Sequence, residues 1–380
     1  MTTNVKVFKS TDAGAPLLSG TAGYLVTVLD AVLVNGYNSK TITITRDGTT
    51  ATATSTAHGF VTGQCLLIAG ADQADYNGEF YITVTGDNAF TFTVANSPAT
   101  PATGTITAKM APAGWTKSYS GTNKAAYQML GGNQRFLRVD DAGTTAARVV
   151  GYEAMTGIDA GTNAFPTDIQ VSGGLYLSKS SVADTSSRVW VILATDKLAH
   201  FFINCAPVAG QLCGVSSFGD IKSFAGSDTY QTITMMQTTA TGSHANLAIC
   251  AGYPNTTPGC YLARAYTQVG SSIPVGKHVD AGKIGATTIN IGGGGLVYPH
   301  PVDGGLYLSP LFIHEAGAVR GTLPGLWAPL HPRPLGHLDT VSGSGDLAGK
   351  NFLAVYFENV AGATITSGEG LLEISNTWAD

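Results

Sequence analysis

Apolar residues recur at helical spacing in one clear segment, residues 19–37 ("SGTAGYLVTVLDAVLVNGY"). The side chains expected on one face of this helix are Leu25, Leu29, Val32 and Leu33. Ser19 or Thr21 is suited to cap its start, and Asn35-Gly36 supplies a stop at its end. The pattern predicts a single amphipathic helix near the N-terminus. The chain after it reads mainly as strand and turn.

Residues 41–109 show a different pattern, in which apolar and polar residues alternate over short runs. The first two runs meet at Asp47-Gly48, and an Asp-Gly pair is among the strongest short-range hairpin signals. Further runs bounded by turn residues follow at 64–70, 78–94 and 103–110. These short strands predict a small all-β module, a β-sandwich or a barrel.

We expect this small β module (residues 41–109) to interrupt a larger domain made of residues 1–40 and 110–380. A strand and one helix before the module are too little chain to bury a core. Hairpins are predicted about Ala142-Gly143 and Asp196-Lys197, and buried strands at 306–315, 351–359 and 370–376. The predicted fold class is mainly β, with a sandwich- or barrel-like main domain, one N-terminal helix and the inserted module.

Charge is sparse along the whole chain. Charged residues make up 12% of the 380 residues, about half of the ~25% typical of soluble domains. No basic stripe is present, so nucleic acid is not an expected partner. No run approaches the ~20 apolar residues of a membrane span, and the first residues lack the apolar core of a secretion signal. A surface with few charges opposes association weakly, which favours packing against other subunits.

One short loop imitates part of a calcium site. Asp75, Asn77 and Gly78 lie where an EF-hand has two ligands and its glycine, but Gln73 and Val84 stand where the first Asp and the last Glu are needed. The residues that follow alternate like a strand, whereas an EF-hand continues into a helix. We interpret the loop as a turn.

The remaining sequence gives no reason to place a catalytic residue, a metal ion or a cofactor. His331 and His337 lie among prolines without zincin spacing, so we expect them to line a loop or to form hydrogen bonds. His200 lies in a strand and is expected to face solvent or a subunit. Carboxylates such as Glu369 and Glu373 are scattered, and no pair stands out for a glycosidase.

The five cysteines (Cys65, Cys205, Cys213, Cys250 and Cys260) form no C-x-x-C pattern and are expected to be buried free thiols.

Residues 57–94 resemble a small β module that recurs in tailed-bacteriophage virion proteins. The features that carry the resemblance are His58-Gly59, the run from Ile68 to Ala71, Asn77-Gly78 and the Thr91-Phe92-Thr93 strand end. The surrounding segments 14–37, 114–128 and 320–332 look similar to phage structural proteins from tail and neck gene neighbourhoods. This second resemblance names no activity, so it assigns no catalytic residue.

The resemblance implies a non-enzymatic virion structural protein, tail-associated and present in several copies. Its partners would be other virion proteins and copies of itself, and the chain would be made in the host cytoplasm and end in the virion. The alternative is a decoration or fibre-like protein whose small β module contacts a host receptor or glycan. A third class is a cell-wall hydrolase carried on the tail.

A proline-rich segment near residue 330 is the best candidate for a subunit contact. Leu326, Trp327 and Leu330 form a compact apolar group there, and prolines stiffen the backbone and lower the entropy lost on docking. Packing of Trp327 into the chain's own core is the alternative, because large aromatic residues usually form cores.

Overall fold

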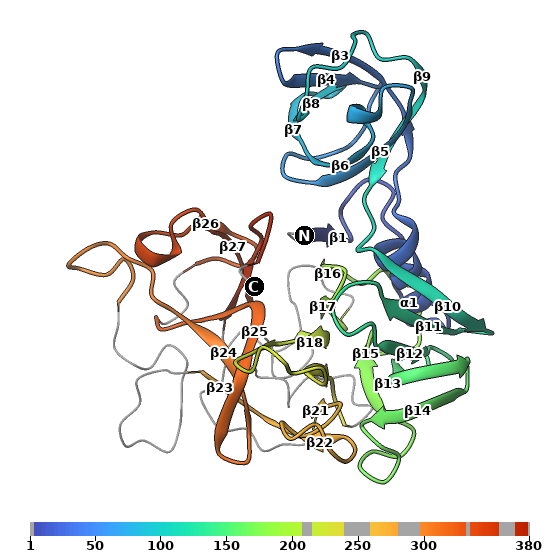
Figure 1. Cartoon of the computed structure of the whole chain (residues 1–380), viewed down its shortest axis with the longest axis vertical. Helices are drawn as coiled ribbons and strands as arrows, with labels where there is room; N and C mark the ends of the chain where they lie inside the picture. The colour runs from blue at the N-terminus through green and yellow to red at the C-terminus, as the bar shows by residue number, and fades with distance from the viewer. Residues whose placement is uncertain are drawn as a thin grey trace.

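The structure is a computed structural model that describes residues 4–206, 215–238, 259–279, 297–331, 335–356 and 369–378. The described chain is built mainly of antiparallel strands in five sheets, and Figure 1 shows one helix beside them. This confirms the mainly-β fold class. None of the sheets closes into a barrel within these ranges, and none of the helices there has the length and apolar character needed to cross a membrane.

The predicted helix is present as α1 (Tyr24–Leu29), which continues as one π-helical turn, η1 (Asp30–Asn35), and ends at Gly36. Its apolar face is buried, as the spacing predicts. The predicted cap is wrong. No side chain of the adjoining residues caps the first turn; the Asp141 carboxylate, distant in sequence, accepts the N–H groups of Leu25 (2.8 Å) and Val26 (3.3 Å) instead.

A seven-stranded central sheet is buried on both faces. In spatial order its strands are β1 (Lys6–Lys9), β16 (Trp190–Ala194), β17 (Leu198–Ile203), β18 (Val215–Asp220), β20 (Thr232–Met235), β21 (Cys260–Leu262) and β22 (Ile273–Pro274). Trp190 and Ile192 point into one apolar core, and Val191 and Leu193 point into another. Burial on both faces explains why the hairpin about Asp196-Lys197, which the structure confirms, is apolar almost throughout.

The first core lies between the central sheet, the helix and a second sheet. That sheet consists of β10 (Trp115–Gly121), β11 (Lys124–Met129), β12 (Phe136–Asp140), β13 (Ala146–Gly157), β14 (Ala160–Phe165) and β15 (Leu175–Ser178). Its β12–β13 pair is the hairpin predicted about Ala142-Gly143.

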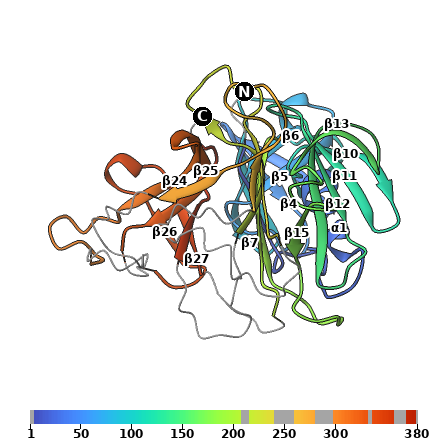
Figure 2. The ribbon, with the colours of Figure 1, turned by 90° about the horizontal axis from the view of Figure 1, so that it is seen from below.

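The second core lies between the central sheet and a C-terminal sheet, and Figure 2 shows the sheets as successive layers. The C-terminal sheet consists of β23 (Gly276–Val279), β24 (Leu308–Glu315), β25 (Ala318–Pro329), β28 (Glu369–Glu373), β27 (Asn351–Tyr356) and β26 (Thr340–Ser342), with β19 (Lys222–Ser223) on β25. Three of these strands, β24, β27 and β28, were predicted. The proline-rich segment begins within β25, which contains Leu326 and Trp327.

The small β module consists of two four-stranded sheets. One contains β2 (Lys40–Thr41), β9 (Gly104–Met110), β5 (Cys65–Ala71) and β6 (Gly78–Tyr81). The other contains β3 (Thr43–Asp47), β4 (Thr50–Thr54), β8 (Ala89–Thr93) and β7 (Thr83–Gly86). The hairpin at Asp47-Gly48 is confirmed, and Figure 1 shows both sheets together at one end of the molecule. The apolar core of the module is continuous with the first core. Independent folding of the module stays a prediction.

The loop that imitates a calcium site is a turn, as predicted. A short 3-10 helix, η2 (Ala74–Tyr76), joins β5 to β6. The Asn77 side chain is held by the backbone of Ala71, with Nδ2 donating to its carbonyl at 2.7 Å and Oδ1 accepting from its N–H at 3.0 Å. The Asp75 carboxylate accepts a hydrogen bond from Asn96 at 2.8 Å.

Candidate functional site

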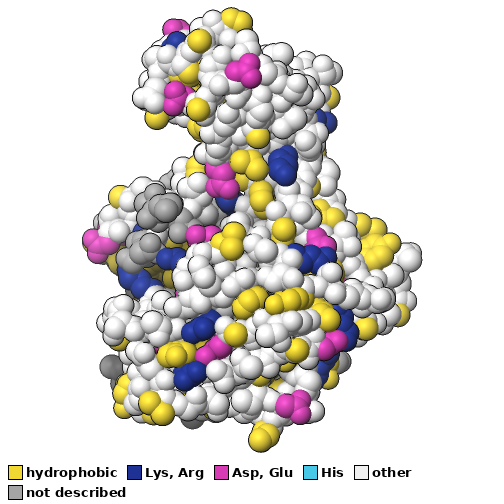
Figure 3. Space-filling model, turned by 45° about the vertical axis from the view of Figure 1, so that its right-hand side comes forward, with side chains coloured by type: hydrophobic (Ala, Val, Ile, Leu, Met, Phe, Trp, Pro, Cys, Tyr) yellow, Lys and Arg dark blue, Asp and Glu magenta, His cyan; other side chains and the backbone are white. Residues whose placement is uncertain are grey.

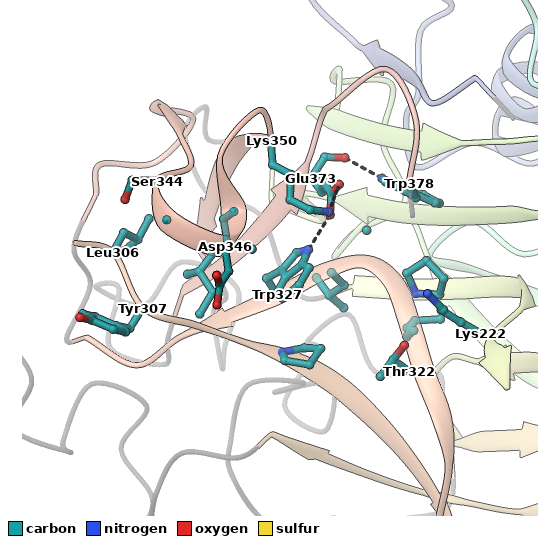
Figure 4. A pocket seen from close by; sticks show the side chains of 18 of the residues that line it. Lys222, Leu306, Tyr307, Thr322, Trp327, Ser344, Asp346, Lys350, Glu373 and Trp378 are labelled. Carbon is teal, nitrogen blue, oxygen red and sulfur yellow. Dashed lines mark hydrogen bonds and ion pairs between the residues drawn. The ribbon is translucent and has the colours of Figure 1, made fainter. Parts of the chain in front are cut away.

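A large pocket opens beside the C-terminal sheet, between the β24–β25 hairpin and the segment before β24 (Figure 4). The short 3-10 helix η3 (Gly345–Leu347) and the C-terminal residues Glu373 and Trp378 complete its wall. Its volume is about 970 Å³, at the upper end of the ~300–1,000 Å³ common for small-molecule pockets. The pocket is the candidate site among the described residues.

A bulge in β25 shapes the wall of this pocket. Pairing with β24 passes directly from Pro310–Trp327 to Leu311–Leu323, which leaves Pro324, Gly325 and Leu326 without partners in β24. Pro324 has no N–H to give to a ladder, so a bulge accommodates it. Its carbonyl instead accepts a hydrogen bond from Nε2 of His200 at 2.8 Å.

Trp327 is held firmly at the centre of the pocket (Figure 4). Its Nε1 donates to Oε2 of Glu373 at 2.9 Å, and the Lys350 ammonium lies 5.4 Å from the ring centroid. Phe352 packs edge-on against the indole, with ring centroids 6.1 Å apart. The half-buried indole is therefore anchored on several sides and still contributes to the pocket lining.

Glu373 contacts three other residues that line the pocket: Trp327, Lys350 and Trp378. Besides accepting from Trp327, its carboxylate pairs with the Lys350 ammonium at 2.6 Å. Its backbone carbonyl accepts from Nε1 of Trp378 at 2.8 Å. Glu373 is 2% exposed. Each of its carboxylate oxygens accepts a hydrogen bond from the protein, Oε2 from Trp327 and Oε1 from Lys350.

Tyr307 borders the other end of the pocket. Its hydroxyl donates to Oδ2 of Asp303 at 2.5 Å, and Oδ1 of Asp303 lies 2.9 Å from Nδ1 of His300. The hydrogen bond from Tyr307, with help from the Gly305 N–H and from His300, lowers the pKa of Asp303 to about 2. Below the pocket rim, Nε2 of His331 accepts the N–H of Tyr307 at 2.8 Å, which makes Nδ1 the protonated ring nitrogen.

Charge in the pocket is mixed and slightly negative. The lining contains the carboxylates of Asp303, Asp346 and Glu373 and the ammonium groups of Lys222 and Lys350. Asp346 lies in the exposed helix η3. Among the described residues, no ion pair engages its carboxylate. This leaves Asp346 available to accept hydrogen bonds from a ligand.

The residues predicted for a subunit contact do not form one group. Leu326 is 1% exposed and packs in the second core, whereas Trp327 lines the pocket. Leu330 is half-buried, and its N–H donates to the Tyr307 carbonyl at 2.9 Å. The pleat of β25 separates Leu326 from Trp327, because neighbouring strand residues point to opposite faces. The contact itself stays a prediction.

The other sequence candidates are structural. His200 is completely buried, which contradicts the expected exposure; its Nδ1 lies 2.7 Å from Oγ of Ser217. Burial lowers the pKa of His200 to about 4. His331 forms hydrogen bonds, as expected. Cys65 and Cys260 are buried free thiols, which confirms that prediction for them, while Cys213 and Cys250 lie outside the described residues.

Sequence reasoning missed the pocket because its residues come from distant segments. Glu373 was only one of several scattered carboxylates, and Asp346 and Tyr307 carry no motif. In the described ranges, no cluster of three or more His, Cys, Asp or Glu residues is arranged to hold a metal ion.

Comparisons with known proteins assign no family. No protein-family model matches the chain, and no curated protein matches it. Among solved structures the chain is similar to "Phage phi92 endosialidase", at 10% identity and a TM-score of 0.15, over 90% of this chain and 52% of that one. The chain thus spans about half the length of that protein. Similarity at this level establishes neither a shared fold nor a shared activity.

Proposed function

We propose that the chain is a non-enzymatic structural protein of a bacteriophage virion, tail-associated and present in several copies. The observation that carries this proposal is the resemblance of residues 57–94 to a module of tailed-phage virion proteins. That segment supplies β5, β6, β7 and β8, four of the eight strands in the two sheets at one end of the molecule. A compact module in that position suits contact with a neighbouring virion protein.

The character of the surface supports the same role. Figure 3 shows a face made largely of uncharged side chains and backbone, on which neither sign of charge gathers into a broad field. Large apolar side chains stand exposed on loops, among them Ile169 at 99%, Val302 at 87% and Val269 at 74%. A sparsely charged surface with exposed apolar groups is suited to burial between subunits.

The first test is the composition of purified particles. Quantitative mass spectrometry should find the chain in several copies per particle, in a fixed ratio to the other structural proteins. Absence from particles, or release of reducing ends or peptides from host cell wall by the purified chain, would contradict the proposal.

Two leucines, Leu326 in β25 and Leu330 just after it, test the predicted subunit contact. Leu330→Ser should lower incorporation into particles and leave the melting temperature of the monomer nearly unchanged, because Leu330 is only half-buried. Leu326→Ser is the contrasting variant, and it should cost about 3 kcal/mol or more of folding stability because its side chain packs in the core. Normal incorporation of Leu330→Ser would remove the contact.

A further inference from the structure

We propose that the pocket beside the C-terminal sheet binds a neutral oligosaccharide. Trp327 would provide the ring against which a sugar packs, and Asp346 would accept hydrogen bonds from sugar hydroxyl groups. This binding site goes beyond the proposed structural role, since a virion subunit can assemble without binding sugar. It also differs from the expectation that the small β module contacts glycans, because the pocket lies in the other part of the chain.

The lining of the pocket suits a polar ligand with apolar faces. Aromatic side chains occur along it, with Phe224, Tyr307 and Trp327 contributed by three different segments. A sugar ring presents C–H groups on its faces and hydroxyl groups around its edge. Aromatic rings match such faces because they offer a large apolar area with few rotatable bonds.

Trp327 is preorganised for this contact. Its indole N–H is bound to Glu373 and its ring packs against Phe352. A ligand that packs on Trp327 therefore immobilises little additional side-chain freedom, which is a main cost of binding. The exposed Asp346 on η3 adds a charged acceptor, and hydrogen bonds to charged groups are stronger than neutral ones.

Charge decides between a neutral ligand and its charged alternatives. A phosphorylated or acidic ligand would meet three carboxylates against two ammonium groups, those of Lys222 and Lys350, and Lys350 is already paired with Glu373 at 2.6 Å. A cationic ligand would compete for Trp327 and Glu373 with Lys350, which the protein holds beside both. A ligand without net charge meets neither obstacle.

The test is calorimetric titration of the full chain with neutral and acidic hexasaccharides. The neutral probes are maltohexaose, cellohexaose, chitohexaose and mannohexaose, and the acidic probe is hexagalacturonate. We expect saturable binding of at least one neutral probe and no binding of hexagalacturonate. Failure of every neutral probe, or preference for hexagalacturonate, would overturn the proposal.

Variants connect binding to this pocket. Trp327→Ala and Asp346→Ala should each weaken the bound neutral probe about tenfold, as expected for an anchor ring and a charged acceptor. Asp346 is exposed, so its variant keeps the fold even if Trp327→Ala does not. Asp47→Ala, at the exposed end of β3 in the small β module, is the matched control and should bind normally. Unchanged affinity in Asp346→Ala and in folded Trp327→Ala would also overturn the proposal. Particle composition is measured separately, so either proposal can fail alone.

Discussion

The ammonium of Lys179 donates a hydrogen bond to the carboxylate of Asp141 where both side chains are completely buried. Lys179 also donates to the Thr21 carbonyl at 2.7 Å, and Asp141 holds the first turn of α1 through Leu25 and Val26. Burial raises the pKa of Asp141 and lowers that of Lys179. The pair therefore connects the start of the helix to the residues that directly follow β12 and β15.

Breaking this pair should be costly. Lys179→Met leaves an unpaired buried carboxylate, and Asp141→Leu leaves an unpaired buried ammonium, so each should cost about 3–5 kcal/mol in the free energy of unfolding. The double variant should be more stable than the sum of the two single losses predicts, because no buried charge remains. Denaturant unfolding of the four proteins measures this, and strict additivity would contradict it.

Gly325 tests the bulge that shapes the pocket. Its φ is +77°, and an added Cβ would lie 2.3 Å from the Trp378 ring. Gly317, at the tip of the same hairpin, has a φ of +82° with nothing within 4 Å. Both Ala variants incur the backbone strain of about 1–3 kcal/mol, but Gly325→Ala should lose clearly more stability. Equal melting temperatures for the two variants would show that the Trp378 ring moves aside without lowering stability, and would contradict this prediction.

His200 should make folding stability depend on pH. Its pKa is about 4 in the folded protein and about 6.5 when unfolded. The unfolded chain therefore binds the proton first as pH falls. Stability is fully present above pH 6.5 and declines as pH falls towards 4, by about 3 kcal/mol for this group. His200→Gln should flatten this part of the pH profile of unfolding free energy, whatever its effect at pH 7. An unchanged slope would contradict the assignment.

The module boundary can be tested by deletion. Lys40 pairs with Ala108 at the base of the small β module, so its two ends lie side by side. We expect residues 41–109 to fold alone, and a chain joining Lys40 to Ala111 through a short Gly-Ser linker to remain folded. The module also contacts the rest of the molecule, through the Lys6–Glu79 ion pair at 2.6 Å. Circular dichroism of both pieces decides the matter, and insolubility of the shortened chain would mean that the parts share one core.

Local patterns were sufficient for several elements. The helical spacing of Leu25 and Leu29, the Asp47-Gly48 turn and the apolar runs of β16 and β17 each predict an element that the structure contains. These features depend on neighbours in sequence, since backbone preference and periodicity act over a few residues.

The remaining features depend on contacts between distant segments. The helix is capped by Asp141 rather than by Ser19 or Thr21, and His200 is buried because the C-terminal sheet covers its strand. Pro324 lies within a strand, because a bulge in the pairing with β24 accommodates a residue that has no N–H. The pocket joins Tyr307, Asp346 and Glu373 only after the C-terminal sheet has formed. The sequence by itself determined the helix and several of the strands; the packing of the layers decided which side chains meet, because burial and pairing are set by distant partners.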